Sequence, residues 1–311
     1  MAYLLRQPIL LLSRSSKVRD VLVKAPLTRS VVQRFVAGTT AKEALATVRE
    51  LREHGLQVTL DFLGEGVDDV AGAEETVRAY LDLIGLLEHA GLAEGSEVSV
   101  KPTAIGLSLP DGEAVALKNA LRIAEAADAA MARMTIDMED SPTIDATLRV
   151  LTAVRERHPD VGVAIQAMLF RTTTDLESLT HAGSRVRLVK GAYAEPASVA
   201  HQDPTEVDLA YVRGLKQLMA GDGYPMVGSH DPRLIAIAEE LATQDDRSES
   251  SYEFQMLYGI RPDEQRRLAA AGHTVRIYVP FGTDWYGYFS RRLAERPANL
   301  LFFLRSLVSR S

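Results

Sequence analysis

The sequence predicts an α/β protein in which parallel strands close into an eight-stranded (βα)8 barrel. From about residue 55, short apolar runs rich in β-branched residues alternate with longer amphipathic segments, and there are eight such runs. Strands that alternate with helices through short connections are typical of parallel sheets. One closed barrel needs about 250 residues, which fits a chain of 311.

An open, doubly wound sheet is the alternative. Such a sheet normally carries a Gly-x-Gly-x-x-Gly turn after its first strand. The corresponding segment here, Leu63–Asp69, lacks the third glycine. The sequence therefore favours the barrel.

The strand assignments follow from composition and length, because short apolar runs of this kind are typical of buried strands. The predicted strands are Leu56–Leu63, Glu97–Pro102, Met134–Met138, Val161–Met168, Arg185–Val189, Met226–Ser229, Tyr252–Leu257 and Thr274–Val279.

The intervening segments have helical periodicity. Thr40–His54 and Glu74–Ala90 carry apolar residues at spacings of three and four. Ser141, Asp203 and Asp231 each precede a proline. A capping side chain followed by proline is favoured where a helix begins. These residues are therefore predicted to cap helices.

The predicted organisation has two parts. Residues 1–54 form an N-terminal helical region, and residues 55–311 form a catalytic barrel domain that ends in a helix begun by Pro297. No linker rich in Gly, Ser or Pro divides the chain.

Composition excludes several classes of protein. The net charge is −7 without a basic block, which argues against a nucleic-acid partner. Cysteine is absent and the seven histidines lack ligand spacing, so no metal site is predicted. No run approaches the roughly 18 to 20 apolar residues of a membrane span. Arg6 and Pro8 interrupt the N-terminal apolar run, which makes a poor signal peptide. We expect a cytoplasmic protein, with a peripheral contact at the inner face of the membrane left open.

Polar residues recur at the ends of the predicted strands, where barrel enzymes place their chemistry. Taken singly, each is better explained as a structural ion pair. Together they predict a polar mouth on an apolar barrel. These residues are Lys101, Asp137, Gln166, Arg187, Lys190, Ser229, His230, Glu253, Gln255 and Tyr278.

Two adjacent arginines follow the last predicted strand. Arg291 and Arg292 lie three or four residues from both Tyr288 and Glu295, so these side chains can share a helix face. Two guanidinium groups can clamp a small carboxylate, provided that this helix lies across the barrel mouth. A solvated basic turn is the simpler interpretation of these residues alone. The further cations Lys101, Arg187 and Lys190 exceed what one carboxylate requires and indicate an anionic cofactor.

The chain resembles the flavin-dependent proline dehydrogenases, both the single-function enzymes and the matching domain of bifunctional proline utilization A. The resemblance runs in order over residues 56–300. It rests on Val98-Ser-Val-Lys-Pro-Thr103, Thr135-Ile-Asp-Met-Glu-Asp140, Ile165-Gln166, Arg187-Leu-Val-Lys-Gly-Ala-Tyr193, Ser229-His230, Tyr252-Glu-Phe-Gln-Met-Leu-Tyr-Gly259, Arg276-Ile-Tyr-Val-Pro280 and Tyr288-Phe-Ser-Arg-Arg-Leu-Ala-Glu-Arg-Pro297.

The resemblance implies a distorted (βα)8 TIM barrel with its last helix above the strands. It also implies oxidation of L-proline to Δ1-pyrroline-5-carboxylate with FAD, by hydride transfer from proline C5 to flavin N5, and electron transfer to a quinone. This reaction is the first step of proline catabolism to glutamate.

The resemblance also implies residue roles. Arg291 and Arg292, assisted by Lys101, would bind the carboxylate of proline, and Tyr278 and Tyr288 would flank its ring. Asp137 and Arg187 would be catalytic, and Asp137 would also support Lys101. Glu65 would form a gate with Arg291. The flavin would be held by Met138, Gln166, Arg187, Lys190, Gly191, Ala192, Ser229 and His230. The chain departs from some relatives at Ala194, where they carry a bulky aromatic residue.

Two other functions are compatible with the strand-end residues. Lys101 or Lys190 could form a Schiff base, as in a lyase of the aldolase kind. A barrel that binds a small acid without turnover is the third possibility.

Overall fold

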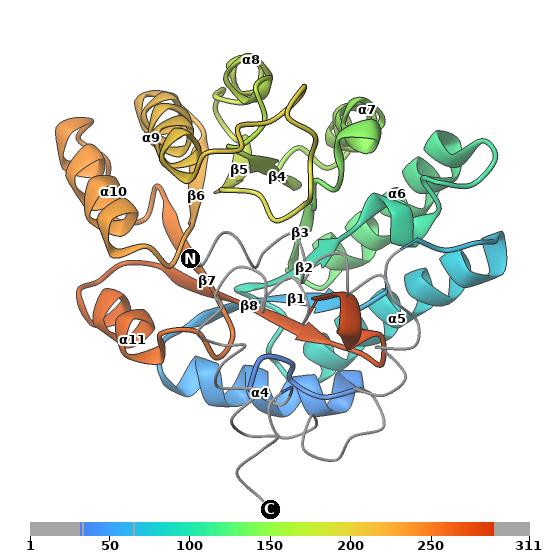
Figure 1. Cartoon of the computed structure of the whole chain (residues 1–311). Helices are drawn as coiled ribbons and strands as arrows, with labels where there is room; N and C mark the ends of the chain where they lie inside the picture. Colours follow the sequence, from blue (N-terminus) through green and yellow to red (C-terminus); the bar gives the residue numbers. More distant parts are fainter. Residues whose placement is uncertain (1–31, 33, 65, 289–311) are drawn as a thin grey trace, which may run out of the picture.

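The computed structural model describes residues 32, 34–64 and 66–288 (Figure 1). Eight parallel strands form a closed barrel in the order β1 to β8, and β1 pairs with β8 to complete it. The predicted fold class is therefore confirmed. The strands are β1 Gln57–Phe62, β2 Ser96–Val100, β3 Arg133–Ile136, β4 Gly162–Gln166, β5 Arg185–Val189, β6 Tyr224–Gly228, β7 Glu253–Leu257 and β8 Val275–Phe281.

Helices surround the strands, and each predicted strand overlaps an observed one. The described helices are α4 Ala41–Glu53, α5 Val70–His89, α6 Gly112–Ala129, α7 Ile144–Arg155, α8 Thr172–Glu177, α9 Pro204–Ala220, α10 Pro232–Gln244 and α11 Pro262–Ala270, with the 3-10 turns η2 Pro102–Ile105 and η3 Ser141–Thr143.

The helix caps are confirmed in two of the three predicted cases. Asp203 accepts hydrogen bonds from the first turn of α9, and Asp231 does the same for α10. The prediction for Ser141 is wrong, because Ser141 begins η3 and α7 starts only at Ile144. Helix α5 begins earlier than predicted, because Asp69 caps it by accepting from Gly72 N.

Helix α4 completes the helical layer around the barrel. It packs against β1 and β8 through Ala44, Leu45, Val48 and Leu51, all of them buried. Figure 1 shows α4 lying between α11 and α5 around the barrel. The wall position beside β8, where a helix following β8 would normally pack, is therefore filled by a helix that precedes β1.

The two faces of the strands differ in polarity. Alternate strand residues such as Val58, Leu60 and Val98 belong to the apolar core beneath the helices. The inward-facing set is polar over most of the height of the barrel. Its members are Thr59, Asp61, Glu97, Ser99, Lys101, Asp137, Arg185, Arg187, Glu253, Gln255, Arg276 and Tyr278.

Contacts between strands that are not neighbours confirm this inward orientation. Arg185 on β5 pairs at 2.9 Å with Glu97 on β2, and β2 and β5 can meet only across the interior. The expected polar mouth is present, but the expectation of an apolar barrel interior is wrong. It fails because periodicity shows which residues alternate and does not show which face is inward.

The buried acids of the interior predict acid sensitivity. Burial alone would raise the pKa of Glu97, but Arg185, Arg276 and Arg187 outweigh burial and lower it. The pKa of Glu253 is lowered in the same way, chiefly by Arg276. A carboxyl whose pKa is depressed by folding contributes stability above its unfolded pKa and loses that stability as the pH falls.

We therefore expect the urea midpoint to fall as the pH drops below the ordinary glutamate pKa of 4.5. The raised pKa of Asp61 favours folding at low pH and has the opposite effect on the midpoint. The two glutamates together are expected to outweigh this single group. A midpoint that stays constant between pH 6 and pH 3 would contradict this prediction.

Candidate active site

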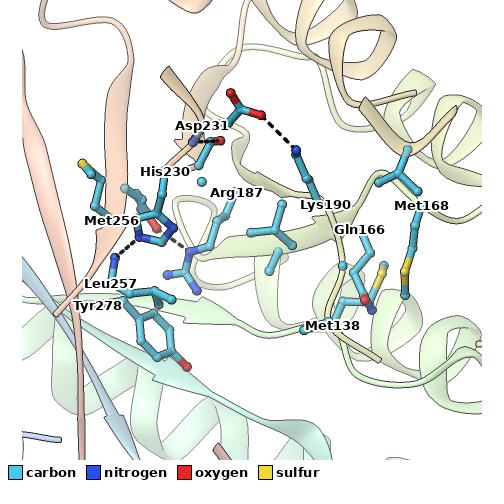
Figure 2. Close-up of a pocket in the computed structure, with 18 of the residues that line it drawn as sticks. Met138, Gln166, Met168, Arg187, Lys190, His230, Asp231, Met256, Leu257 and Tyr278 are labelled. Atoms are coloured by element: carbon cyan, nitrogen blue, oxygen red, sulfur yellow. Dashed lines mark hydrogen bonds and ion pairs between the residues drawn. The ribbon is translucent and has the colours of Figure 1, made fainter. Parts of the chain in front are cut away.

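A pocket of about 700 Å³ opens at the carboxyl ends of the strands (Figure 2). Predicted site residues from seven of the eight strand ends line it, namely Lys101, Asp137, Met138, Gln166, Arg187, Lys190, Gly191, Ala192, Ser229, His230, Gln255, Tyr278 and, after the last strand, Tyr288. The remaining strand, β1, contributes Asp61. The structure thus brings together almost all of the predicted residues that it describes.

Lys101 lies directly after β2 and pairs with Asp61 of β1, with 2.5 Å between Nζ and Oδ1. Both side chains are buried. Burial raises the pKa of Asp61, and the charge of Lys101 offsets part of that shift. The family resemblance implies that Asp137 supports Lys101, and the pairing of Lys101 with Asp61 was not predicted. A carboxylate in the middle of the apolar run Val58–Phe62 was the available signal.

Arg187 and Asp137 form the centre of the site. Their charged groups lie 2.6 Å apart between Nη1 and Oδ1. The hydroxyl of Tyr278 donates to the other oxygen of Asp137 at 2.9 Å, and the Arg187 guanidinium lies 5.4 Å from the centre of the Tyr278 ring. Burial, reinforced by Asp137, raises the pKa of Tyr278 well above its usual value. Tyr278 therefore stays a neutral donor, and Asp137 accepts from both partners.

The residues expected to hold a flavin surround the pocket. Met138, Gln166 and Lys190 lie across it from Tyr278, whereas His230 lies beside Leu257 on the same side as Tyr278 (Figure 2). Gln166 donates from Nε2 to the Glu139 carbonyl at 2.6 Å, while its buried Oε1 has no hydrogen-bond partner among the described residues. His230 accepts at Nε2 from Leu257 N at 2.8 Å. When neutral, this imidazole therefore carries its proton on Nδ1.

The loop after β5 depends on Gly191. Its φ is +106°, a conformation that side chains rarely adopt. A Cβ at this position would also lie 2.6 Å from the sulfur of Met168. Glycine thus lets the backbone pack closely against Met168, which also lines the pocket.

Lys190 belongs to a cluster of four charges at the pocket rim. It pairs with Asp208 of α9, and at 3.3 Å with Asp231 at the start of α10. Arg233 bridges the same two carboxylates at 2.8 and 2.7 Å. Hydrogen bonding from Arg233 and the charge of Lys190 lower the pKa of Asp231. Sequence analysis missed Asp208 and Arg233, because they lie inside helices rather than at strand ends.

Several predicted residues fall outside the described part of the chain. These are Glu65, Arg291, Arg292 and Glu295. Tyr288, the last described residue, is 5% exposed and lines the pocket. It packs with Leu63 and Phe35 in a small apolar cluster. The chain thus reaches the pocket at Tyr288, three residues before Arg291.

Among the described residues, no cluster of histidine, aspartate or glutamate could hold a metal ion. None of the helices in residues 32–288 has the length and apolar character needed to cross a membrane.

A closed parallel barrel with a buried, charged pocket at the carboxyl ends of its strands defines the chain as a barrel enzyme. The profile of the proline dehydrogenase family matches residues 44–305. The chain is 38% identical over 308 residues to proline dehydrogenase 1 of Bacillus subtilis, and the matched region covers 99% of this chain and 100% of that protein. It is also 38% identical over 282 residues to the proline dehydrogenase of Deinococcus radiodurans, with 90% of both chains covered. The chain belongs to the proline dehydrogenase family.

Solved structures show the same fold. Proline utilization A from Bdellovibrio bacteriovorus, inactivated by N-propargylglycine, superposes with a TM-score of 0.78 at 23% identity. The match covers 86% of this chain and 32% of that one, so the chain spans about a third of the larger protein. This likeness extends the fold assignment to the distorted barrel of these domains.

Family membership makes the chain an oxidoreductase of the first step of proline catabolism, and it implies a flavin cofactor. The pocket residues fit a flavin. The unpaired Oε1 of Gln166 can accept from a ring N–H, and Lys190 can neutralise phosphate. The Schiff-base lyase and the non-catalytic barrel have no comparable support.

Proposed function

We propose that the chain oxidises L-proline to Δ1-pyrroline-5-carboxylate with FAD as its flavin and a quinone as the electron acceptor. The observation that carries the proposal is the pocket itself. It joins the Lys101–Asp61 and Arg187–Asp137 ion pairs to a flavin-compatible wall, in a member of the proline dehydrogenase family.

A bound flavin supplies the hydride acceptor at N5, and the protein provides position and electrostatics. Lys101 neutralises the carboxylate of proline and fixes one end of the substrate. Tyr278, held by Asp137, would pack against the substrate ring and orient C5 toward the hydride acceptor. The ammonium group of proline would first lose a proton to water, because the nitrogen lone pair forms the new bond. Loss of a hydride from C5 to the flavin would then give a protonated C5=N bond, and release of its N–H proton to water would give the product.

Arg187 has the second electrostatic role in this proposal. It is buried and fully charged, because the attraction of Asp137 and Glu97 exceeds the effect of burial and raises its pKa. A fixed cation beside the pocket stabilises the negative charge that develops during the reaction. The remaining flavin contacts are assigned to Met138, Gln166, Lys190, Gly191, Ala192, Ser229 and His230.

Arg291 and Arg292 are proposed to bind the substrate carboxylate from a helix over the barrel mouth. Two observations support this placement. Helix α4 fills the wall position beside β8, and Tyr288 already lines the pocket. The helix that follows β8 therefore starts at the mouth. We propose residues 55–311 as the catalytic domain on the same grounds.

Replacing Arg292 by alanine is expected to raise the KM for L-proline at least about thirtyfold, because truncating a buried charged contact costs about 2 kcal/mol or more. Steady-state kinetics over a wide proline range would measure this. Arg296→Ala, outside the Arg291–Arg292 pair, is the matched control. A near-normal KM for Arg292→Ala would refute the clamp.

Glu65 is proposed to close the site by pairing with Arg291. Glu65→Ala is therefore expected to leave the bound flavin unchanged and to lower kcat/KM for proline through weaker substrate capture. Stopped-flow flavin reduction at low proline concentration would measure this effect. Kinetics identical to those of the unaltered protein would eliminate the gate.

Anaerobic titration tests the function as a whole. The purified protein is expected to be yellow, to contain FAD, and to lose its flavin absorbance when L-proline is added without oxygen. A quinone should then restore the colour. A colourless protein that borohydride traps on lysine with a carbonyl substrate would overturn the proposal in favour of the lyase.

We further propose a cytoplasmic protein that contacts the inner face of the membrane peripherally, where quinones are found. Co-sedimentation with lipid vesicles, compared with and without bound substrate, would test this contact. Failure to bind vesicles in either state would exclude it.

A further inference from the structure

Glu97 lies inside the barrel, beneath the pocket and outside its lining. It is fully buried on β2, and its two carboxylate oxygens serve two arginines of β5. Oε1 accepts from Arg187 Nη2 at 2.8 Å, and Oε2 accepts from Arg185 Nη2 at 2.9 Å. Thr59 donates to the same carboxylate. This acid therefore connects the floor of the barrel to the arginine that faces the pocket.

The orientation of Arg187 is fixed partly from the pocket and partly from beneath it, where Glu97 and Ser99 lie. Besides Glu97, its guanidinium donates to Asp137 at 2.6 Å, to Ser99 at 2.9 Å and to Gln255. These bonds use four of its five N–H donors. Gln255 is itself oriented by Glu253, to which it donates at 2.6 Å. Glu97, Ser99 and Gln255 lie on strands and Asp137 directly follows one, so the guanidinium has little freedom to rotate.

The charges in the described interior balance. Ion pairs inside the barrel join four acids to four bases. The acids are Asp61, Glu97, Asp137 and Glu253, and the bases are Lys101, Arg185, Arg187 and Arg276. Water does not screen such charges effectively. Removing one charge at the floor would therefore change the potential in the pocket.

We propose that Glu97 is a positioning residue, which fixes the orientation of Arg187 and limits the positive field that Arg187 applies to the flavin. The midpoint potential of the flavin is then set partly from the barrel floor. This inference rests on the proposed function.

The electrostatic argument gives opposite signs for the two partners. Glu97→Gln removes a negative charge beneath Arg187, so the pocket becomes more positive and the reduced flavin, which carries more negative charge, is favoured. The midpoint potential should rise. Arg185→Met removes a positive charge from the same network, and the potential should fall. General damage to the barrel would not produce opposite shifts.

The experiment measures the midpoint potential of the purified, flavin-loaded protein by equilibration with reference dyes. Every tenfold change in the relative stability of the reduced flavin shifts a two-electron potential by about 30 mV. We expect an upward shift for Glu97→Gln and a downward shift for Arg185→Met. The control is Asp175→Asn on α8, whose carboxylate is also largely buried and pairs with Arg171 outside the barrel. Its potential should not move.

The double variant Glu97→Gln/Arg185→Met covers the case in which Glu97→Gln does not fold. It leaves the interior without a net charge change, so its potential should stay near that of the unaltered protein. Its rate of flavin reduction should still fall, because the neutral amide oxygen of glutamine holds Arg187 more weakly than the carboxylate does. Shifts of the same sign in the two single variants, or a double variant with an unchanged reduction rate, would overturn the role of Glu97.

The failure of this inference can be distinguished from failure of the proposed function. The proposed function is rejected if the unaltered protein binds no flavin, or if L-proline does not reduce the bound flavin. If the protein binds flavin and proline reduces it, but the Glu97→Gln and Arg185→Met variants leave the midpoint potential unchanged, only the positioning role is rejected.

Discussion

Replacing Arg187 by methionine is expected to slow the reduction of the flavin by proline by about a hundredfold or more, the usual cost of removing one preorganised donor from an active site. The variant should also lose stability. It leaves Glu97 without its Arg187 contact and Asp137 without its ion pair, and breaking a buried pair costs about 3–5 kcal/mol. Stopped-flow absorbance would measure the rate, and chemical denaturation would measure the free energy of unfolding.

Arg187→Lys separates charge from geometry. Lysine keeps the positive charge but lacks the planar fork that reaches Glu97, Asp137 and Gln255 together. We expect this variant to retain flavin more completely than Arg187→Met while remaining slow. An Arg187→Met protein with full flavin content and a normal reduction rate would remove Arg187 from the site.

Replacing Arg276 by methionine is expected to be as destabilising as the change at Arg187, without a direct effect on the pocket. Arg276 is 1% exposed and pairs with Glu253 at 2.8 Å. It also donates to the carbonyls of Val58 and Gly95. Loss of the guanidinium leaves a buried carboxylate unpaired, which costs about 3–5 kcal/mol.

The two arginine variants should therefore separate stability from catalysis. At a temperature where both remain folded, Arg276→Met should bind flavin and should react with proline much faster than Arg187→Met, because it leaves every contact of Arg187 in place. The double variant Arg276→Met/Glu253→Gln, which removes both charges, should recover part of the lost stability. No recovery in the double variant would contradict the ion-pair explanation.

Much of the fold could be predicted from the sequence, because the strands are short apolar runs between helices with clear caps. Arg185–Val189 was predicted with its observed ends. The polarity of the barrel interior could not be predicted. A strand such as β5 alternates arginine with valine and leucine, and this pattern fits a polar inward face as well as a polar outward one.

The candidate site was predictable where polar residues end or directly follow strands, as with Asp137, Gln166 and Lys190. Asp61 and Glu97 lie within strands, and their partners Lys101 and Arg185 are 40 and 88 residues away in sequence. Pairing of β1 with β2 brings the first pair together, and only closure of the barrel brings the second pair together. The cluster of Asp208, Asp231 and Arg233 around Lys190 likewise depends on how α9 and α10 are placed.

The position of α4 has a consequence for the topology of the chain. Because α4 covers the seam between the last strand and the first, the helical coat closes without help from the segment after β8. The apolar wall beside β8 therefore does not need that segment as a cover. A chain cut back to start at β1 would lose this cover, and Val58 and Ile277, both buried in the core, would be exposed to water.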